Sequence, residues 1–368
     1  MLSGAMIRVG VADLPLHYGK TPAWLFSRME LLAGEIITVI VKEYSAQEFL
    51  RRLADPFWFQ AFGCCLGFDW HSSGLTTTVC AAIKSALKDR GKELGIFVAG
   101  GKGKTSRQTP QEIAEIGEKS WVDSPEQLIY ASRLSAKVDN NALQDGYQLY
   151  HHSFFFTSEG KWAVVQQGMY EHWARRYHWL SEKIESFVCE PHSAIYSQRK
   201  ARVLNMVAKE SEEVRKASVY LACQKPEKVV KEIKHLERLT LPSKHSLSLF
   251  DIQPQNLSRV LLSTYERQPQ NFEELLGIEG VGAKTVRALS LISELIYGTK
   301  VSTRDPARFS FAHGGKDGYP YKVERRIYDN SINFLREAIL QAKLGHPEKL
   351  KAMKRLSKMS QSLSYRVR

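Results

Sequence analysis

The stretch Gly277-Ile-Glu-Gly-Val-Gly-Ala-Lys-Thr285 constrains the fold of this chain more than any other. A segment whose apolar residues recur at helical spacing precedes it. This segment begins after Asn271, a residue type that commonly caps a helix. A second apolar segment with helical spacing follows, from Val286 to Gly298. The pattern predicts a short helix, a tight hairpin and a longer helix over residues 271–298.

The glycines of this hairpin are typical of a phosphate-binding site. Gly280 and Gly282 permit positive φ and carry no Cβ, so the peptide N–H groups between them can approach a ligand closely. Lys284 and Arg287, in the first turns of the second helix, would add positive charge at the same place. The DNA-binding residues predicted in this segment are Gly280, Gly282, Lys284, Thr285 and Arg287.

The same stretch resembles the helix-hairpin-helix motif of DNA repair and recombination proteins, in which a Gly-Val-Gly hairpin is followed by Lys or Arg and a small residue. The resemblance covers residues 271–298 and implies nucleic-acid binding. A structural alternative is a corner between two helices of a helical domain, where glycines permit close packing.

The positive charge of the chain lies in its second half. Residues 1–190 carry 20 Lys and Arg against 21 Asp and Glu, a net charge of −1, whereas residues 191–368 carry 32 against 18, a net charge of +14. Because the hairpin lies in the basic half, charge and motif both indicate one polyanion-binding face. The last residues, 346–368, are basic and poor in aromatics, and are expected to form a flexible tail.

The composition argues against several classes of protein. No apolar run approaches the roughly twenty residues of a membrane helix, and the N-terminus shows no export signal. We therefore expect a cytoplasmic protein without membrane contact. An odd number of cysteines without a CxxC pair also argues against a disulfide framework or a zinc ribbon; the five are Cys64, Cys65, Cys80, Cys189 and Cys223.

A predicted buried strand, residues 94–100, runs into a basic glycine-containing loop, residues 101–107. The order is similar to that of a P-loop, but the position five before Gly103 is Val98, where the motif requires Gly. We therefore expect no ATPase. Lys102 and Lys104 instead indicate a mobile basic loop beside a nucleic-acid backbone, or a solvated turn.

The segment richest in chemical groups surrounds a predicted β-hairpin, residues 147–168. Two alternating runs flank Ser158-Glu-Gly160, and the period of two places His151 and His152 on opposite faces. Phosphodiester cleavage requires an activated water and neutralised charge, usually supplied by divalent ions on carboxylates. The candidate catalytic residues are therefore Asp139, Asp145, His151, His152 and Gln166.

Asp139, Asp145 and His151 are the candidate ligands of Mg²⁺ or Mn²⁺. The same residues also have a purely structural interpretation. Asp139 could cap a helix, Asp145 and Gly146 could form a turn, and the histidines could be satisfied in the core.

Arginines and aromatic residues alternate over residues 170–188. Single-strand binding surfaces combine cations with rings on which bases stack, so Arg175 and Arg176 join the predicted DNA-binding set. The alternative is a seam between domains.

These segments together predict an α+β fold. Residues 1–190 are expected to form a mixed α/β catalytic domain with the β-hairpin, and residues 191–345 an all-α basic domain that contains the helix-hairpin-helix, followed by the tail. Helices are expected over residues 24–44, 46–53 and 75–90.

Over nearly its full length the chain resembles the family catalogued as domain of unknown function 763, found in bacteria and archaea. The resemblance implies no established catalytic residue. It rests on Asp13–His17, Asp55–Phe59, Phe68–Gly74, Gly100–Thr105, Ala136–Asp139, Gln144–His152 and Phe309–Gly315.

Three functions are compatible with these features. The first is a metal-dependent nuclease acting on single-stranded or junction-containing DNA. The second is a base-excision glycosylase or lyase, because helix-hairpin-helix glycosylases use a hairpin Lys and a later Asp, here Lys284 and Asp305, although the interval of 21 residues is longer than expected. The third is a DNA-binding protein without enzymatic activity. Homo-oligomerisation is compatible with each.

Overall fold

The computed structural model describes residues 21–67, 73–197, 201–236, 254–307, 325–343 and 345–364. Within these ranges, helices surround an antiparallel sheet, so the chain is α+β. Parts of the family-resemblance stretches, including residues 13–17, 68–72 and 309–315, lie outside the described residues. Among the described residues, no helix is both long and apolar enough to cross a membrane.

The main sheet has five strands in the order β1-β3-β4-β5-β6, each antiparallel to its neighbours. The predicted hairpin is confirmed as β3 and β4, in which Phe156 pairs with Trp162. A second sheet pairs β2 with β7. The strands are β1 (Ile96–Lys102), β2 (Leu143–Gln144), β3 (Gln148–Thr157), β4 (Trp162–Tyr170), β5 (Trp173–Leu180), β6 (Ala194–Ser197) and β7 (Leu204–Asn205).

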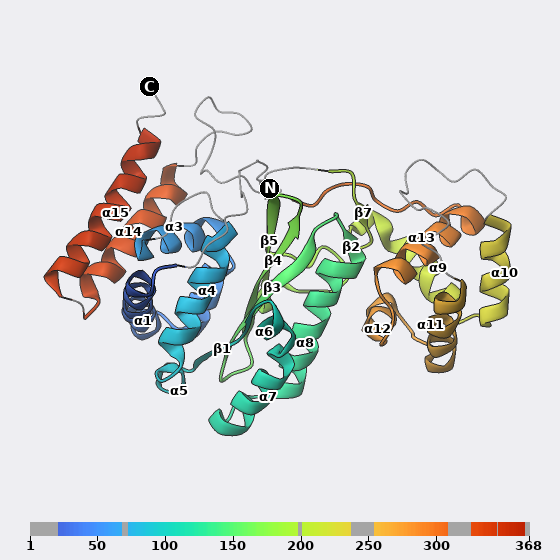
Figure 1. Ribbon diagram of the computed structural model, residues 1–368, viewed down its shortest axis with the longest axis horizontal. Helices are drawn as coiled ribbons and strands as arrows, with labels where there is room; N and C mark the ends of the chain where they lie inside the picture. The colour runs from blue at the N-terminus through green and yellow to red at the C-terminus, as the bar shows by residue number, and fades with distance from the viewer. Residues whose placement is uncertain are drawn as a thin grey trace, which may run out of the picture.

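Helices of the first half cover both faces of this sheet (Figure 1). Helices α2 and α4 contact one face, and α7 and α8 contact the other. The helices are α1 (Ala23–Glu43), α2 (Ala46–Leu53), α3 (Pro56–Leu66), α4 (Ser73–Leu87), α5 (Gly91–Leu94), α6 (Lys104–Arg107), α7 (Thr109–Ser120) and α8 (Pro125–Lys137), followed by the π-helical turn η1 (Val138–Ala142) and the 3-10 turn η2 (Ser181–Lys183).

The second half of the described chain is helical apart from its short strands. Its elements are the 3-10 turn η3 (Lys209–Ser211) and the helices α9 (Glu212–Ala222), α10 (Pro226–Leu236), α11 (Pro254–Arg267), α12 (Phe272–Gly277), α13 (Ala283–Tyr297), α14 (Arg325–Gln341) and α15 (His346–Ser364).

Two hydrophobic cores lie on opposite faces of the sheet. Successive side chains of a strand point to opposite faces, and β3 shows this directly, because Phe155 belongs to one core while Phe154 and Phe156 belong to the other. The Phe155 core contains residues of α1 to α4, and the Phe154 core contains residues of α8, α9, α12 and α13.

The last two helices pack with the first ones. Helices α14 and α15 belong to the Phe155 core together with α1 and α3. The Arg355 guanidinium donates to the carbonyl oxygen of Cys65 at 2.8 Å, and Ala352 and Leu356 are buried. Residues 346–364 therefore form a helix in place of the expected flexible tail, and it packs on α3 through Ala352 and Leu356, which are one turn apart on one helical face.

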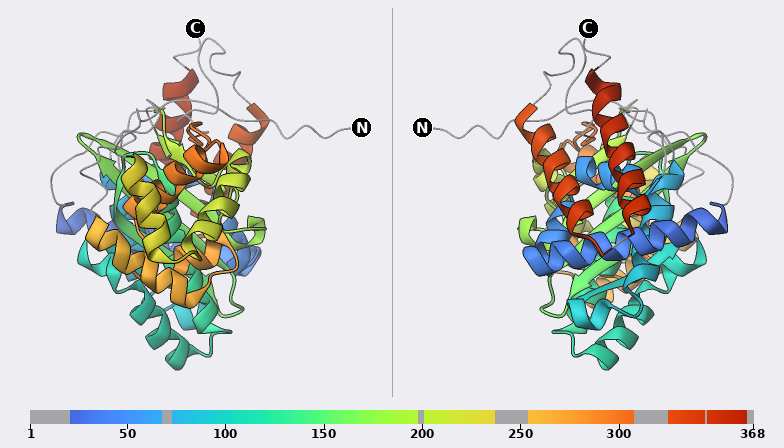
Figure 2. Two further views of the ribbon diagram at one scale, coloured as in Figure 1. Left: turned by 90° about the vertical axis from the view of Figure 1, so that its right-hand side faces the viewer. Right: turned by 90° about the vertical axis from the view of Figure 1, so that its left-hand side faces the viewer.

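This arrangement divides the basic half of the sequence between the two ends of the molecule. Helices α9 to α13 lie at one end, and α14 and α15 lie at the other, with the sheet between them (Figures 1 and 2). The described Lys and Arg residues of α9–α13 and of α14–α15 therefore lie at opposite ends of the molecule, which corrects the expectation of one basic face for this part of the chain.

Candidate functional site

Helices α12 and α13 are joined by a short segment, residues 278–282. The Asn271 side chain caps α12 by accepting a hydrogen bond from the Glu274 N–H at 2.9 Å. Gly280 has φ of +86°, a conformation that glycine adopts without strain. Gly282 is the N-cap residue of α13 with φ of −121°, and Gly298 ends that helix in the left-handed region.

The glycines of the connecting segment lie at the surface, while Ile278 and Val281 are buried beneath them. A Cβ added to Gly282 would meet nothing within 4 Å, and one added to Gly280 would contact only the Val260 side chain, at 3.5 Å. Among the described residues, the backbone N–H groups of Gly280, Gly282 and Ala283 have no hydrogen-bond acceptor. Three donors are thus available at the N-terminus of a 15-residue helix.

Lys137, at the end of α8, anchors this segment to the sheet domain. Its Nζ donates to the carbonyl oxygens of Leu276, Gly277 and Ile278, at 2.8, 3.0 and 2.7 Å. These are the last carbonyls of α12, where a cation is favourable. Burial lowers the pKa of Lys137, while Glu279 acts in the opposite direction.

Gln144 makes a second link between the sheet domain and α13. Its Nε2 donates to the Ala283 carbonyl at 2.8 Å, and its Oε1 accepts from Arg287 Nε at 2.6 Å. Arg287 is consequently half-buried and partly engaged, and Thr285 is buried. Of the three side chains predicted here to bind DNA, only Lys284 is exposed.

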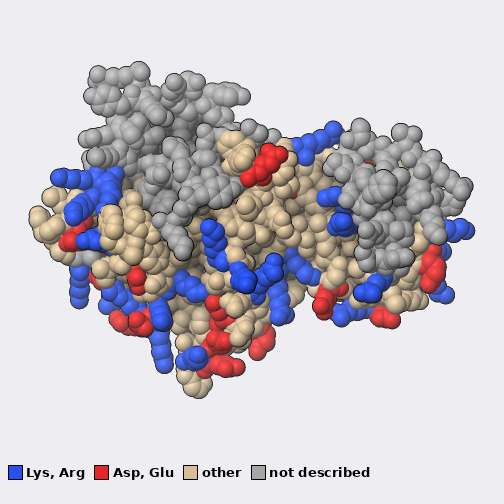
Figure 3. All heavy atoms as spheres, viewed as in Figure 1, with Lys and Arg blue, Asp and Glu red and all other residues tan. Residues whose placement is uncertain are grey.

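Charges of both signs surround the segment, and Figure 3 shows both at this end of the molecule. Lys284 and Arg259 are exposed cations, and Arg259 directly precedes the Val260 that lies beside Gly280. Glu274 and Glu279 are exposed acids. Any affinity for a polyanion therefore depends on local donors rather than on a broad positive field.

Asp139 lies at the centre of a second cluster and is fully buried in η1. Its carboxylate accepts hydrogen bonds from Gln166 Nε2 at 2.7 Å and from Trp179 Nε1 at 2.8 Å, and its other oxygen pairs with His192 Nε2. The sequence did not indicate Trp179 or His192, because each is more than 35 residues from Asp139 and no local pattern links them.

His152 extends this chain of side chains across the sheet. Its Nδ1 lies 2.9 Å from Gln166 Oε1, and its Nε2 lies 2.9 Å from the Ser132 hydroxyl. Since the Gln166 amide nitrogen donates to Asp139, its oxygen faces His152, whose Nδ1 must therefore carry the proton. Burial lowers the pKa of His152 to about 4, so the ring is neutral at pH 7.

Asp145 is occupied by a different set of donors. Arg175 and the Tyr177 hydroxyl each donate to its Oδ2 at 2.8 Å, and the Tyr147 N–H donates to its Oδ1 at 3.0 Å. The bond from the Tyr147 N–H closes a turn at Asp145 and Gly146, which is the structural role that the sequence offered for these two residues. Burial raises the pKa of Asp145, an effect that the Arg175 charge opposes.

Arg175 and Arg176 are fully buried, so their assignment to a DNA-binding surface is wrong. Both lie in β5, which has neighbouring strands on each side; α2 and α4 cover one of its faces, and Asp145 and Asp305 lie against Arg175. The Arg176 guanidinium donates to Thr76 at 3.3 Å and lies over the rings of Phe59 and Tyr196. The alternation of cations and aromatics marks a central strand with polar contacts on both faces.

The three predicted metal ligands do not meet. His151 points to the opposite face of the sheet from His152 and bonds the Ser153 hydroxyl at 3.1 Å, whereas the oxygens of Asp139 and Asp145 face N–H and O–H donors. Among the described residues, no group of three or more His, Cys, Asp or Glu side chains is arranged to hold a metal ion. These residues therefore do not fit a shared Mg²⁺ or Mn²⁺.

Asp305, the acid of the glycosylase alternative, is also engaged. Arg175 donates to both of its oxygens, and the N–H groups of Ala201 and Ala307 donate to it at 2.8 and 2.9 Å. A buried, fully bonded carboxylate cannot assist Lys284 in catalysis.

The predicted basic loop, residues 101–107, is replaced by the end of β1, which includes Lys102, and by the short helix α6, which begins at Lys104; both lysines are exposed. Gly103 connects the two, and its N–H donates to the Tyr150 carbonyl at 2.8 Å, which fixes this turn to β3.

Neither a comparison with curated protein sequences nor one with solved structures gave a match. A family model described as protein of unknown function (DUF763) matches residues 10–323, which is most of the chain and includes the hairpin between α12 and α13. By this match the chain belongs to the DUF763 family.

Proposed function

We propose that this protein binds DNA, single-stranded or containing junctions, through residues 277–285. The observation that carries the proposal is the set of backbone donors without an acceptor at Gly280, Gly282 and Ala283, at and just before the start of α13, together with the open space around Gly282. The helix-hairpin-helix resemblance of the same residues supports it.

The chemistry of the segment suits a phosphate group. Phosphate oxygens accept hydrogen bonds from N–H groups at a helix N-terminus, where the helix dipole also favours negative charge. Gly282 has no side chain to keep the phosphate away, and Lys284 in the first turn adds a cation. Lys137 and Gln144 hold the segment in place before a ligand arrives, which reduces the entropy lost on binding.

Contacts of this kind recognise the sugar–phosphate backbone and not the bases. The proposed binding is therefore independent of sequence and sensitive to salt. Cleavage is not part of the proposed function, because Asp139 and Asp145 are bonded to protein donors and Arg175 and Arg176 are buried.

Fluorescence anisotropy with labelled single-stranded, duplex and junction DNA tests the proposal. We expect Lys284→Glu to weaken binding by about tenfold, since a charge-assisted phosphate contact contributes roughly 1.5 kcal/mol. Lys300→Glu is the matched control, because Lys300 is also exposed but lies beyond the other end of α13. Equal loss in both variants would show a non-specific charge effect and contradict the assignment.

Side-chain size at Gly282 provides a second test that does not alter charge. The φ of −121° and the open space allow larger residues, so Gly282→Ala and Gly282→Leu should fold normally. We expect affinity for DNA to fall from glycine to alanine to leucine, because the added carbon atoms exclude the phosphate. Wild-type affinity in Gly282→Leu would refute the proposed contact.

The same DNA incubated with Mg²⁺ and with EDTA should stay intact.

A further inference from the structure

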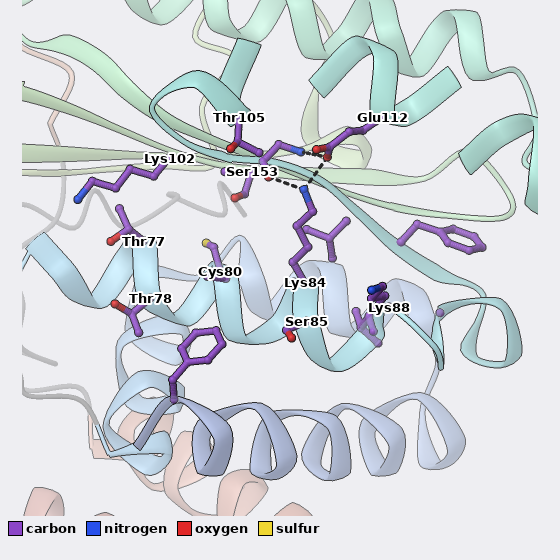
Figure 4. A pocket seen from close by; sticks show the side chains of 18 of the residues that line it. Thr77, Thr78, Cys80, Lys84, Ser85, Lys88, Lys102, Thr105, Glu112 and Ser153 are labelled. Atoms are coloured by element: carbon purple, nitrogen blue, oxygen red, sulfur yellow. Dashed lines mark hydrogen bonds and ion pairs between the residues drawn. The ribbon is translucent and has the colours of Figure 1, made fainter. Parts of the chain in front are cut away.

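A large cavity lies away from the hairpin, along the edge strand β1 and between α4 and α7 (Figure 4). Its volume is about 1210 Å³, somewhat above the roughly 300–1,000 Å³ of most small-molecule sites, and it is open to solvent on one side. Residues of α1, α4, α7 and β1 line it, together with Ser153 of β3.

Lysines dominate the charged groups of the cavity. The described lining contains five lysines, against Glu112 and Glu115. Lys84 is neutralised by Glu112 at 2.6 Å, which leaves four cations to one acid. An anionic ligand is therefore favoured. The four are Lys88, Lys92, Lys102 and Lys119.

Glu112 also holds the wall of the cavity in place. Its Oε2 accepts from the Gly100 N–H at 2.8 Å as well as from Lys84, and Lys84 Nζ donates in turn to the Gly100 carbonyl at 2.8 Å (Figure 4). Gly100 has φ of +86°, and a Cβ there would lie 2.2 Å from the His152 carbonyl oxygen. The end of β1 is thus fixed by ion pairing and by close backbone packing.

The fixed strand end presents polar groups to the cavity. Figure 4 shows Lys102, Thr77 and Thr78 near one end, Lys84 in the middle and Lys88 towards the other end. Thr105 and Ser153 add hydroxyl groups to the lining. Phosphate oxygens accept hydrogen bonds from hydroxyl and ammonium groups of this kind.

Another part of the lining is apolar. Leu25 and Phe26 of α1 contribute hydrocarbon and aromatic surface, whereas the ring of Phe97 is largely buried against Phe156. A ligand made only of phosphate would leave this surface without a contact, whereas a ligand with a ring system would cover it.

We propose that this cavity binds a nucleoside phosphate, with the phosphate among the lysines and hydroxyls and the base against the apolar residues. The same chemistry is available from a free nucleotide or from the 5′-phosphorylated end of a DNA strand. The cavity does not involve the α12–α13 hairpin, so this site is independent of the proposed function.

Isothermal titration calorimetry of the full chain tests the site, with ATP, adenosine, inorganic pyrophosphate and a short oligonucleotide with or without a 5′-phosphate. We expect ATP or the 5′-phosphorylated strand to bind at least about tenfold more tightly than its unphosphorylated counterpart. The stronger of the two identifies the source. Pyrophosphate binding as tightly as ATP would overturn the base contact, and no binding by any of these probes would overturn the site.

Variants separate this cavity from general charge effects. Lys102→Glu combined with Lys88→Glu should reduce affinity by about tenfold or more, because both side chains line the cavity. Lys104→Glu is the matched control, since Lys104 is exposed two residues after Lys102, at the start of α6, but is not part of the lining. Lys284→Glu should leave nucleotide binding unchanged. An equal loss in Lys104→Glu would overturn the assignment, provided that thermal unfolding shows every variant to be folded.

Discussion

Arg175 of β5 binds Asp305, 130 residues later in the chain, through both terminal nitrogens of its guanidinium, at 3.1 and 2.8 Å. The same guanidinium donates to Asp145, and the side chains of all three residues are buried. This cluster joins the central sheet to the segment that follows α13, and so connects the sheet to the second half of the chain.

Replacing one member of this cluster should strongly destabilise the fold. Arg175→Met leaves two buried carboxylates without their cation, a change that typically costs about 3–5 kcal/mol. Urea denaturation measures the free energy of unfolding. Glu182→Gln is the control, because Glu182 forms a more exposed pair with Arg51 whose loss should cost less than about 1 kcal/mol. Similar losses in the two variants would contradict the structural role of Arg175.

Buried histidines should make the protein less stable in weak acid. Burial lowers the pKa of His151 to about 3 and that of His152 to about 4. Below about pH 6.5 the unfolded chain takes up protons on these rings while the folded protein does not, so the free energy of unfolding falls by about 1.4 kcal/mol per pH unit for each histidine.

Urea denaturation at several pH values between 7 and 5 measures this slope. In the variant His152→Gln the free energy of unfolding should depend less steeply on pH, by about 1.4 kcal/mol per pH unit. The reason is that a group that titrates only in the unfolded state has been removed. The exposed His172 provides the control, and His172→Gln should keep the wild-type slope. An unchanged slope in His152→Gln would mean that this ring is protonated in the folded protein.

Asp139→Asn tests whether the buried carboxylate is structural. Asp139 accepts from Gln166, Trp179 and His192, and an amide would turn an N–H group towards one of these donors. We expect a loss of about 2–4 kcal/mol in the free energy of unfolding. Asp123→Asn, at an exposed acid, should have little effect. Stabilisation of the wild type by Mn²⁺, lost in Asp139→Asn, would instead reveal a metal ligand.

Lys137→Met should loosen the hairpin without unfolding the protein. The substitution removes three hydrogen bonds to the end of α12 while keeping much of the side-chain volume. We expect faster amide hydrogen exchange in residues 272–286 and unchanged exchange in β3 and β4. Lys300→Met, an equivalent change at an exposed lysine, should leave exchange in both regions as in the wild type. Uniformly faster exchange would point to global destabilisation.

Local patterns in the sequence were sufficient to predict several helices and one β-hairpin, because these elements are stabilised by residues close together in the chain. The helices at Ala23–Glu43 and Ala46–Leu53 and the hairpin around Gly160 occur where helical periodicity, strand alternation and turn residues predict them. The opposite orientation of His151 and His152 follows from the same alternation.

The tertiary structure alone decided which side chains pair and which are available to a ligand. The sequence cannot show that Arg175 meets Asp305, that α15 packs on α3, or that Asp139 is bonded to His192, because each contact joins segments far apart in the chain. Charged residues are expected at the surface unless such a partner exists. The sequence therefore located the exposed glycine hairpin, while the long-range partners decided that Asp139, Asp145 and Arg175 belong to the interior.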